Sequence, residues 1–544
     1  MLLSSETRYR VIWGYKYTVG RVGAHNVRPC KFLTNVCVGA DLCVRPYGYG
    51  TAYKFIFSPK GHFPLEIRSL GACFGGRKGI YCFLNEKRGE SAMPQNDFSQ
   101  GKVSQNILSM ALPMTLAQLI NILYNIVDRV YLGHLEGVGR MSITGLGLCL
   151  PVISILIGFA NLCGMGGGPL CSIYRGRGEK EEAEHVMGNS FALLLVFGVV
   201  LTAIGLMFRK PILYLFGASD LTFPYANDYL SIYLCGTIFV MIGLGMNPFI
   251  NAQGFGRMGM MTVTLGAAVN LVLDPIFIFL LHMGVRGAAL ATVISQGCSA
   301  IWVLRFLTGS KAILRLRWET MALRRERVSR ILSLGSSGFV MALTNSLVQI
   351  LCNATLQRTG GELYVGVMTV INSVREVITM PVSGVTNGCQ PVLGYNYGAG
   401  LYKRVREGIR FTTAVTMAYS LGAWVLVMAV PHVFIHVFNS EAELLEAGVP
   451  AFHIYFAAFF CMAFQFIGQS VFVGLNRSRS AVFFSLFRKA MIVAPLTVLL
   501  PALGWGVDGV FWAEPISNVV GGSACFLTMI LTVYIPLGHE QDRN

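Results

Sequence analysis

The sequence carries little charge for its length. Only 13% of its 544 residues are Asp, Glu, Lys or Arg, whereas soluble domains contain about 25%. Hydrophobic residues make up 54% of the chain, and the mean hydropathy is +0.57. Most of the chain therefore does not face water, and the composition excludes an ordinary soluble domain.

The sequence also lacks the short motifs of common catalytic and metal sites. It contains no HExxH zinc motif, nucleophile elbow or P-loop. The fourteen cysteines include no CxxC pair, and nine of them are scattered singly in or near apolar stretches. We therefore expect no enzyme activity, no cofactor, no disulfide framework and no metal site beyond a possible Na⁺.

The net charge of +16 does not indicate a nucleic-acid partner. Residues 1–92 contain about 14 Lys and Arg against about 5 Asp and Glu, and short basic loops account for most of the remainder. A basic patch interleaved with stacking aromatics, which single-stranded nucleic acid requires, is absent. We expect no nucleic-acid binding.

Long apolar stretches are abundant from residue 107 onward. About 20 such residues suffice to cross the roughly 30 Å of a bilayer's hydrocarbon. Twelve spans are predicted, at residues 107–132, 142–165, 187–208, 227–249, 260–282, 287–308, 331–356, 363–389, 409–430, 450–473, 481–503 and 508–535. The fold class is therefore an all-α membrane protein embedded in a lipid bilayer.

The chain repeats itself at a spacing of 222 residues. Among the matching positions are Gly166 and Gly388, Tyr233 and Tyr455, and the stretches that begin at Gly284 and Gly506. This spacing is far longer than a solenoid unit. It predicts two parallel six-helix repeats, as in transporters that rock one half against the other.

Charge in the loops predicts the orientation. Basic residues follow the even-numbered spans, namely Arg175, Arg177, Lys180, Lys311, Arg315, Arg317, Arg324, Arg325, Arg327, Arg330, Lys403, Arg404, Arg406, Arg477 and Arg479. The alternate loops are acidic or poor in Lys and Arg. By the positive-inside rule, both termini are cytoplasmic.

These patterns divide the chain into four parts. We expect a six-helix lobe at residues 93–310, a basic cytoplasmic linker at 311–330 and a second lobe at 331–544. Residues 1–92 show neither a helical nor a strand period and no signal peptide. Our hypothesis is that they are an upstream extension, non-native or disordered, and that the working protein starts at Met93.

Ionisable residues inside spans are candidates for function, because each costs about 2.5–3.5 kcal/mol to insert. Asp128 lies near the end of the first span, one turn after Tyr124. Asp274 lies in the fifth span, one turn after Asn270, and Thr292 lies in the sixth. Hard oxygen ligands suit Na⁺, and a desolvated carboxylate can carry a proton. Two other roles stay open: Asp128 as an interfacial charge, and Asp274 as a helix-packing group.

The second half offers weaker candidates. The positions that correspond to Asp128 and Asp274 are Ile350 and Leu496, so the first half alone is predicted to hold the ion site. Glu514 and the neighbours Arg375 and Glu376 are secondary candidates. Arg488 and Lys489 are expected to extend back to the cytoplasmic surface.

Several motifs resemble a known family. The stretches ALPM, IVDRVYLGHL, GMGGG, NLVLDPIFIF, GVRGAALATVIS and PVLGYNYGAG are similar to those of MATE (multidrug and toxic compound extrusion) transporters. The resemblance covers residues 104–537, about four-fifths of the chain, and favours the DinF-like and MepA-like bacterial branch.

The resemblance implies an H⁺- or Na⁺-coupled antiporter that exports cationic amphipathic compounds by alternating access. We expect it to be a monomer in the cell's inner membrane. It places the cation site on Asp128, Asn270, Asp274 and Thr292, with Tyr124 beside them. The alternative is a flippase for a lipid-linked oligosaccharide or precursor, which would need a strongly cationic cavity. The few bases within spans argue against that alternative.

Overall fold

The computed structural model describes residues 36–37, 42–46, 53–57, 74–76, 79–81, 97–133, 139–438 and 442–541. The chain forms two compact units, Met1–Glu90 and Ser91–Asn544.

Short strands occur in the first unit, where no strand period was found in the sequence. Strands β1 (Val36–Cys37), β2 (Leu42–Pro46) and β3 (Tyr53–Phe57) form an antiparallel sheet. Strands β4 (Phe74–Gly76) and β5 (Gly79–Tyr81) pair separately. Strands of two to five residues are too short for an alternating pattern to stand out. The hypothesis of a start at Met93 falls largely on residues outside the described ranges and stays a prediction.

The second unit is helical. Its first half contains α1 (Val103–Gly133), α2 (Gly139–Gly176), α3 (Lys180–Leu215), α4 (Phe223–Cys235), α5 (Thr237–Ala252), α6 (Gly256–Pro275), the π-helix η1 (Ile276–Leu280) and α7 (Val285–Thr308). A short 3₁₀ helix, η2 (Trp318–Met321), follows.

The second half contains more breaks in its helices. It comprises α8 (Arg325–Thr359), α9 (Gly361–Gly398), α10 (Tyr402–Ala429), α11 (Pro431–Phe438), α12 (Ala442–Phe456), η3 (Phe459–Cys461), α13 (Met462–Gly474), α14 (Ser478–Leu486), η4 (Phe487–Val493), α15 (Ala494–Leu500), η5 (Pro501–Trp505), α16 (Gly506–Ser517), η6 (Asn518–Gly522), α17 (Ser523–Met529), η7 (Ile530–Tyr534) and α18 (Ile535–Gln541).

These helices account for the twelve predicted spans. Within the described residues, nine helical runs are long and apolar enough to cross a membrane, or eleven if the two bent pairs α4–α5 and α12–α13 each count as one span. One run covers 63 residues, Ser478–Glu540. Its backbone reverses at Gly504 (φ 92°) and Gly506 (φ 56°), a conformation that glycine permits, and it therefore supplies two spans.

The sequence repeat recurs in the backbone. Most residues with a left-handed backbone occur in pairs 222 residues apart: Gly178 (φ 79°) with Gly400 (72°), Gly254 (90°) with Asn476 (59°), His282 (51°) with Gly504 (92°), and Gly284 (54°) with Gly506 (56°). In two of these pairs one member is not a glycine. The duplicated fold has therefore kept its turns where the side chains have changed.

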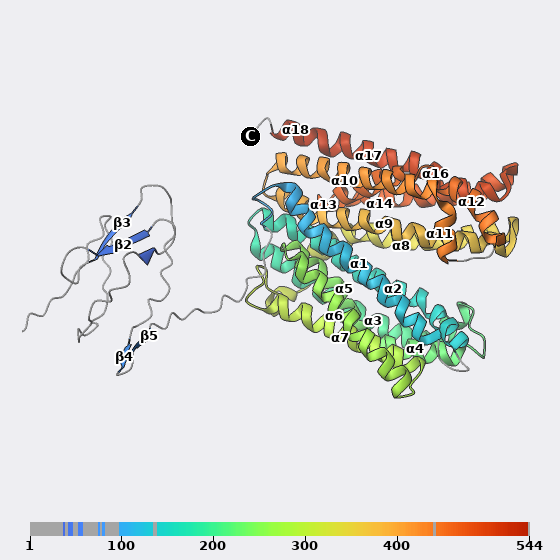
Figure 1. The fold of residues 1–544 in the computed structure, drawn as a ribbon, viewed down its shortest axis with the longest axis horizontal. Helices are drawn as coiled ribbons and strands as arrows, with labels where there is room; N and C mark the ends of the chain where they lie inside the picture. The colour runs from blue at the N-terminus through green and yellow to red at the C-terminus, as the bar shows by residue number, and fades with distance from the viewer. Residues whose placement is uncertain are drawn as a thin grey trace, which may run out of the picture. The chain divides into compact units, whose positions relative to one another are not determined.

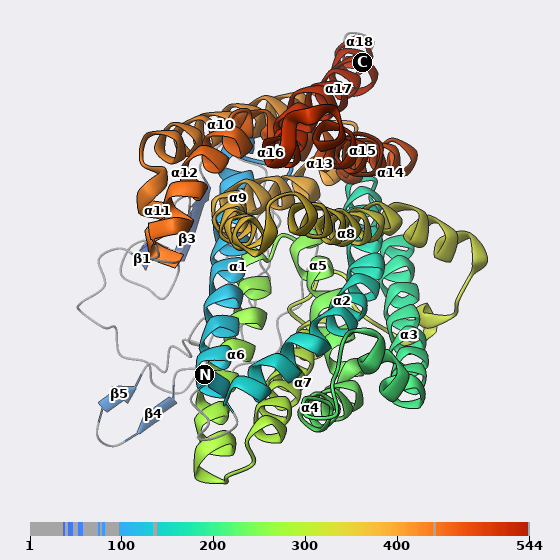
Figure 2. The ribbon, with the colours of Figure 1, turned by 90° about the vertical axis from the view of Figure 1, so that its right-hand side faces the viewer.

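Helices α1–α7 form one lobe and α8–α18 the other (Figure 1). The lobes meet where α1 and α2 lie against α8 and α9, at the centre of Figure 2. At the end that carries the basic loops, a Cβ on Gly176 would collide with the carbonyl of Tyr395, and one on Gly398 with the carbonyl of Ile173. These two contacts are related by the 222-residue repeat. At both of them the backbones of the two lobes are in direct contact.

The basic segment before α8 packs on the first lobe. Gln253 Oε1 accepts hydrogen bonds from the backbone N–H groups of Ile313 and Leu314, both at 2.9 Å. Asn189 donates to the carbonyls of Thr320 (3.1 Å) and Ala322 (3.0 Å). Helix α8 begins at Arg325, inside the segment predicted as a linker. The rest of that segment is held in place by buried polar side chains.

Candidate functional site

The five residues predicted to bind a cation lie on three helices of the first lobe. Tyr124 and Asp128 are on α1, Asn270 and Asp274 on α6, and Thr292 on α7. Helix α6 packs against both α1 and α7. The fold therefore brings together residues that are up to 168 positions apart in the sequence.

The two acids are buried and near each other. Asp128 is 7% exposed and Asp274 is 1% exposed, and they are close enough for their charges to interact. Asn270 Nδ2 donates a hydrogen bond of 3.2 Å to Asp274 Oδ1. Asp274 Oδ2 is buried and has no hydrogen-bond partner in the described part of the chain. This second oxygen is available to a proton or to a hard cation.

Local sequence explains the geometry at Asp274. The next residue, Pro275, has no N–H to donate, and α6 gives way there to the π-helix η1. Thr292 on α7 donates its hydroxyl to the carbonyl of Ala288 at 2.9 Å, so its oxygen lone pairs remain available as acceptors.

Two tyrosines of α4 belong to the same region and were not predicted. Tyr229 and Tyr233 are 3% and 5% exposed, and their rings stack with centroids 6.1 Å apart. Tyr229 lies within electrostatic range of Asp128 and Tyr124, and beside Thr292. The one signal in the sequence was that Tyr233 matches Tyr455 in the repeat, which does not indicate a role.

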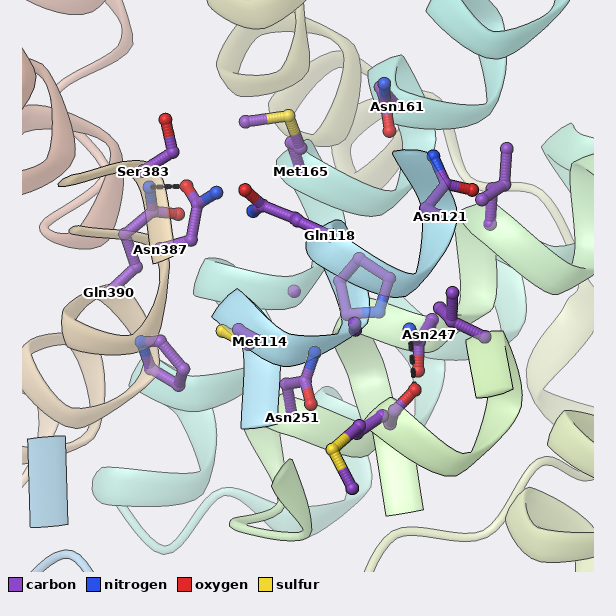
Figure 3. A pocket seen from close by; sticks show the side chains of 18 of the residues that line it. Met114, Gln118, Asn121, Asn161, Met165, Asn247, Asn251, Ser383, Asn387 and Gln390 are labelled. Carbon is purple, nitrogen blue, oxygen red and sulfur yellow. Dashed lines mark hydrogen bonds between the residues drawn. The ribbon is translucent and has the colours of Figure 1, made fainter. Parts of the chain in front are cut away.

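A cavity of about 530 Å³ lies next to this site. Figure 3 shows Met114, Gln118 and Asn121 of α1 on its wall, with Asn247 and Asn251 of α5 and Asn387 and Gln390 of α9. Among the described residues that line it, Glu376 is the one that carries a charge. The five predicted residues line neither this cavity nor the next one described. Amides and methionines form a surface that suits varied amphipathic molecules.

A second cavity of about 760 Å³ adjoins the first in the other lobe. The two share lining residues, namely Met165, Glu376, Thr379, Ser383, Asn387 and Gln390. Its remaining wall includes Asn345, Gln349, Asn353, Asn372, Gln465 and Gln469, together with three basic residues. The two cavities therefore form one central space between the lobes.

The basic residues correct one expectation from the sequence. Arg488 and Lys489 do not extend to the surface: their side chains are 7% and 10% exposed, and both bind Glu514 of α16. Arg488 Nη2 lies 2.5 Å from Glu514 Oε1, and Lys489 Nζ lies 3.0 and 2.9 Å from the two carboxylate oxygens. Helix α16 brings Glu514 within ion-pair distance of both side chains, so they point inward to this acid.

Arg375 of α9 completes this group, with Nη1 3.9 Å from Glu514 Oε1. We call Arg375, Arg488, Lys489 and Glu514 the second-lobe charge cluster. Arg488 and Lys489 lie in the π-helix η4, whose extra residue per turn lets two adjacent side chains reach one carboxylate. All four residues were noted in the sequence, but nothing in the sequence indicated that they lie close together in the fold.

No group of three or more His, Cys, Asp or Glu side chains that could hold a metal ion occurs among the described residues. Asp128 and Asp274 offer carboxylate oxygens of the kind that can take up a proton or a hard cation.

Comparison with known proteins is consistent with this arrangement. The MatE family profile matches residues 113–276 and 338–499. The multidrug export protein MepA of Staphylococcus aureus is 24% identical over 442 residues, which cover 80% of this chain and 95% of that protein. The MepA of Staphylococcus haemolyticus is 23% identical, with 80% and 94% covered. An outward-facing structure of a multidrug-resistance MATE transporter aligns with a TM-score of 0.76 at 21% identity, covering 82% of this chain and 99% of that one.

Proposed function

The chain belongs to the MatE family as a MepA-like member, and on that premise we propose that it exports cationic amphipathic compounds in exchange for H⁺ or Na⁺. One observation carries the proposal. Helix α1 provides Gln118 and Asn121 to the wall of the central cavity and, two turns further on, Asp128 to the buried acid pair. A change at the acids is therefore transmitted to the cavity through one rigid element.

The coupling ion would bind at Asp128 and Asp274. Two nearby buried carboxylates repel each other, and a proton or Na⁺ relieves that repulsion. Asn270, Thr292 and Tyr124 add neutral oxygens to the site. Coupling requires that ion and substrate favour different conformations, because a ligand that binds both equally shifts nothing. The acid pair and the cavity are separate sites that share α1, so ion and substrate can each act on the position of this helix.

Alternating access would proceed by movement of one lobe against the other. The close glycine contacts of Gly176 and Gly398 lie at the end with the basic loops. The second cavity extends along α8 and α9 toward their joining turn at the opposite end, past Asn353 and Thr369. With basic loops in the cytoplasm, this arrangement is the outward-facing one. The proposal places the protein in the cell membrane as a monomer, with both termini cytoplasmic.

The alternative, a flippase for a lipid-linked precursor, requires a strongly cationic cavity. In the part of the chain that the structure describes, Glu376 is the one charged residue on the wall of the first cavity. The three bases line the second cavity and not the first, and all three lie close to Glu514. This distribution favours a substrate with a cationic part over a pyrophosphate carrier.

Ethidium efflux from cells that express the protein tests the proposal. We expect wild-type efflux to stop when both the proton and the sodium gradients are collapsed, and collapsing them separately identifies the coupling ion. Asp128→Asn and Asp274→Asn should each slow efflux at least tenfold. Asp508→Asn, at an exposed acid of α16, is the matched control and should export normally. Wild-type efflux by both site variants would refute the cation site.

A further inference from the structure

The second-lobe charge cluster contains more positive than negative charge. Arg375, Arg488 and Lys489 share one carboxylate, that of Glu514. The next acid is Glu376, which lines both cavities and follows Arg375 directly on α9. Adjacent residues of a helix do not face each other, and in the described part of the chain Glu376 forms no ion pair with the three bases. The cluster therefore has a surplus of positive charge.

This surplus lies deep in the membrane-spanning region. Arg375 is fourteen residues from the start of α9 at Gly361, about 21 Å along the helix. Lys489 is eleven residues from the start of α14 at Ser478, about 17 Å along α14 and the π-helix η4 that continues it. Because charges in spans are costly, they are retained where they serve a site. One base would suffice to neutralise Glu514.

The bases, and not the acid, face the open space. Arg375, Arg488 and Lys489 all line the second cavity, whereas Glu514 does not. Glu514 lines a small cavity of about 30 Å³ behind it, which also touches Arg375 and Lys489. Arg375 is the most accessible of the four, with 27% of its side chain exposed. A molecule in the central space therefore meets three cations, with the carboxylate behind them.

Arg488 of the cluster is tightly packed. The Arg488 side chain packs on Gly521 of η6, where a Cβ would meet Arg488 Cγ at 3.0 Å. Ser517 Oγ donates a hydrogen bond of 3.4 Å to the Arg488 carbonyl. Preorganised guanidinium groups bind carboxylates and phosphates well, since less side-chain freedom is lost on binding.

We propose that Arg375, Arg488 and Lys489 form an oxyanion-binding site in the second cavity, which takes the carboxylate or phosphate of an amphipathic molecule. The site rests on the proposed export function and extends its substrate class to amphipathic cations that also carry an acidic group. A zwitterion fits both cavities: its cationic part lies toward Glu376 and its oxyanion lies at the three bases.

Binding of two matched dyes to the full-length protein in phosphatidylcholine nanodiscs tests this site. Rhodamine B carries a free carboxylate, and its ethyl ester has the same ring system without one. We expect Arg375→Gln to weaken rhodamine B binding about tenfold, the effect of one charge-assisted hydrogen bond, and to leave ester binding unchanged. Lys489→Gln should act in the same direction. Arg358→Gln, at an exposed position of α8, should change neither affinity.

Ester binding serves as the folding control for each variant. Equal loss of both dyes, or no loss of either, would overturn the oxyanion site while leaving the export function standing. If the wild-type protein binds the ester but not rhodamine B, or binds neither dye, the oxyanion site is wrong, and ethidium efflux decides the export function separately.

A second lipid identifies the source of the oxyanion. In phosphatidylglycerol nanodiscs, a lipid phosphate that occupies the site would lower rhodamine B affinity for the wild type but not for Arg375→Gln. An unchanged wild-type affinity assigns the site to a soluble substrate's acidic group. General repulsion by the anionic lipid surface would lower the rhodamine B affinities of the wild type and of Arg375→Gln equally. The comparison of the two dyes in phosphatidylcholine would then decide whether the oxyanion site exists.

Discussion

Arg404, at the start of α10 in the second lobe, donates a hydrogen bond of 3.0 Å to the backbone carbonyl of Phe98, in the segment that leads into α1. The same guanidinium donates to the carbonyls of Gln100 (3.0 Å) and Gly101 (2.9 Å). The buried ring of Phe98 lies in turn 5.4 Å from the guanidinium of Arg175 on α2. These contacts tie the two lobes together at the end that carries the basic loops.

Arg404→Ala should loosen that end of the molecule. The substitution removes three hydrogen bonds to the segment before α1 and a fourth, from Nε to Asn396 Oδ1, within the second lobe. Losing the three bonds between the lobes, partly screened by solvent, should cost the conformation with the lobes in contact about 2 kcal/mol. We expect the distance between spin labels at Glu179 and Lys403, both exposed, to lengthen and broaden. Arg410→Ala, an exposed position on the same helix, is the control. An unchanged distance distribution in the Arg404 variant would show that these bonds do not hold the lobes together.

Gly176→Ala tests the glycine contact between the lobes. A methyl group there collides with the Tyr395 carbonyl, so the helices must separate, at a cost of about 1–3 kcal/mol. The same pair of spin labels should report a longer distance, and efflux should slow. Gly147→Ala on the same helix meets no atom within 4 Å and should behave as wild type. Normal efflux and distance in both variants would contradict a need for close approach.

Glu514→Gln should lower the stability of the protein and raise its affinity for rhodamine B. The substitution leaves three bases without their acid, and breaking a buried ion pair in this way costs about 3–5 kcal/mol of stability. The unfolding temperature in detergent should therefore fall, whereas that of Glu446→Gln, at an exposed acid of α12, should not. Rhodamine B should bind more tightly to the Glu514 variant, because the bases no longer share their charge with a carboxylate. A fall in stability with weaker rhodamine B binding would mean that Glu514 organises the bases instead of competing for them.

Much of the fold could be predicted from the sequence because its determinants are local or repeated. Each of the twelve predicted spans falls on a helical run of the structure, and its ends extend no more than two residues beyond that run. The positions of the turns followed from the 222-residue repeat, since glycines such as Gly178 and Gly284 recur with their left-handed conformations. The short strands of residues 36–81 were missed because they show no periodicity over so few residues.

The candidate cation site was predictable in part. Asp128 and Asp274 stood out because acids are rare in spans, and the structure brings them near each other. Tyr229 could not be selected, since buried tyrosines are common in helix packing. Its relevance appears only when α4 is seen to pack on α7, with Tyr229 in electrostatic range of Asp128.

The second-lobe charge cluster shows where the sequence stops being informative. By itself the sequence determined a duplicated helical membrane protein with two acids in its first half, because hydropathy, charge bias and repeats are properties of the chain. Whether Lys489 reaches the membrane surface or Glu514 depends on which partner is nearer, and that depends on how η4 and α16 pack. In the tertiary structure Lys489 Nζ lies 2.9 Å from Glu514 Oε2. The packing thereby turned three scattered bases into one basic wall of the central cavity.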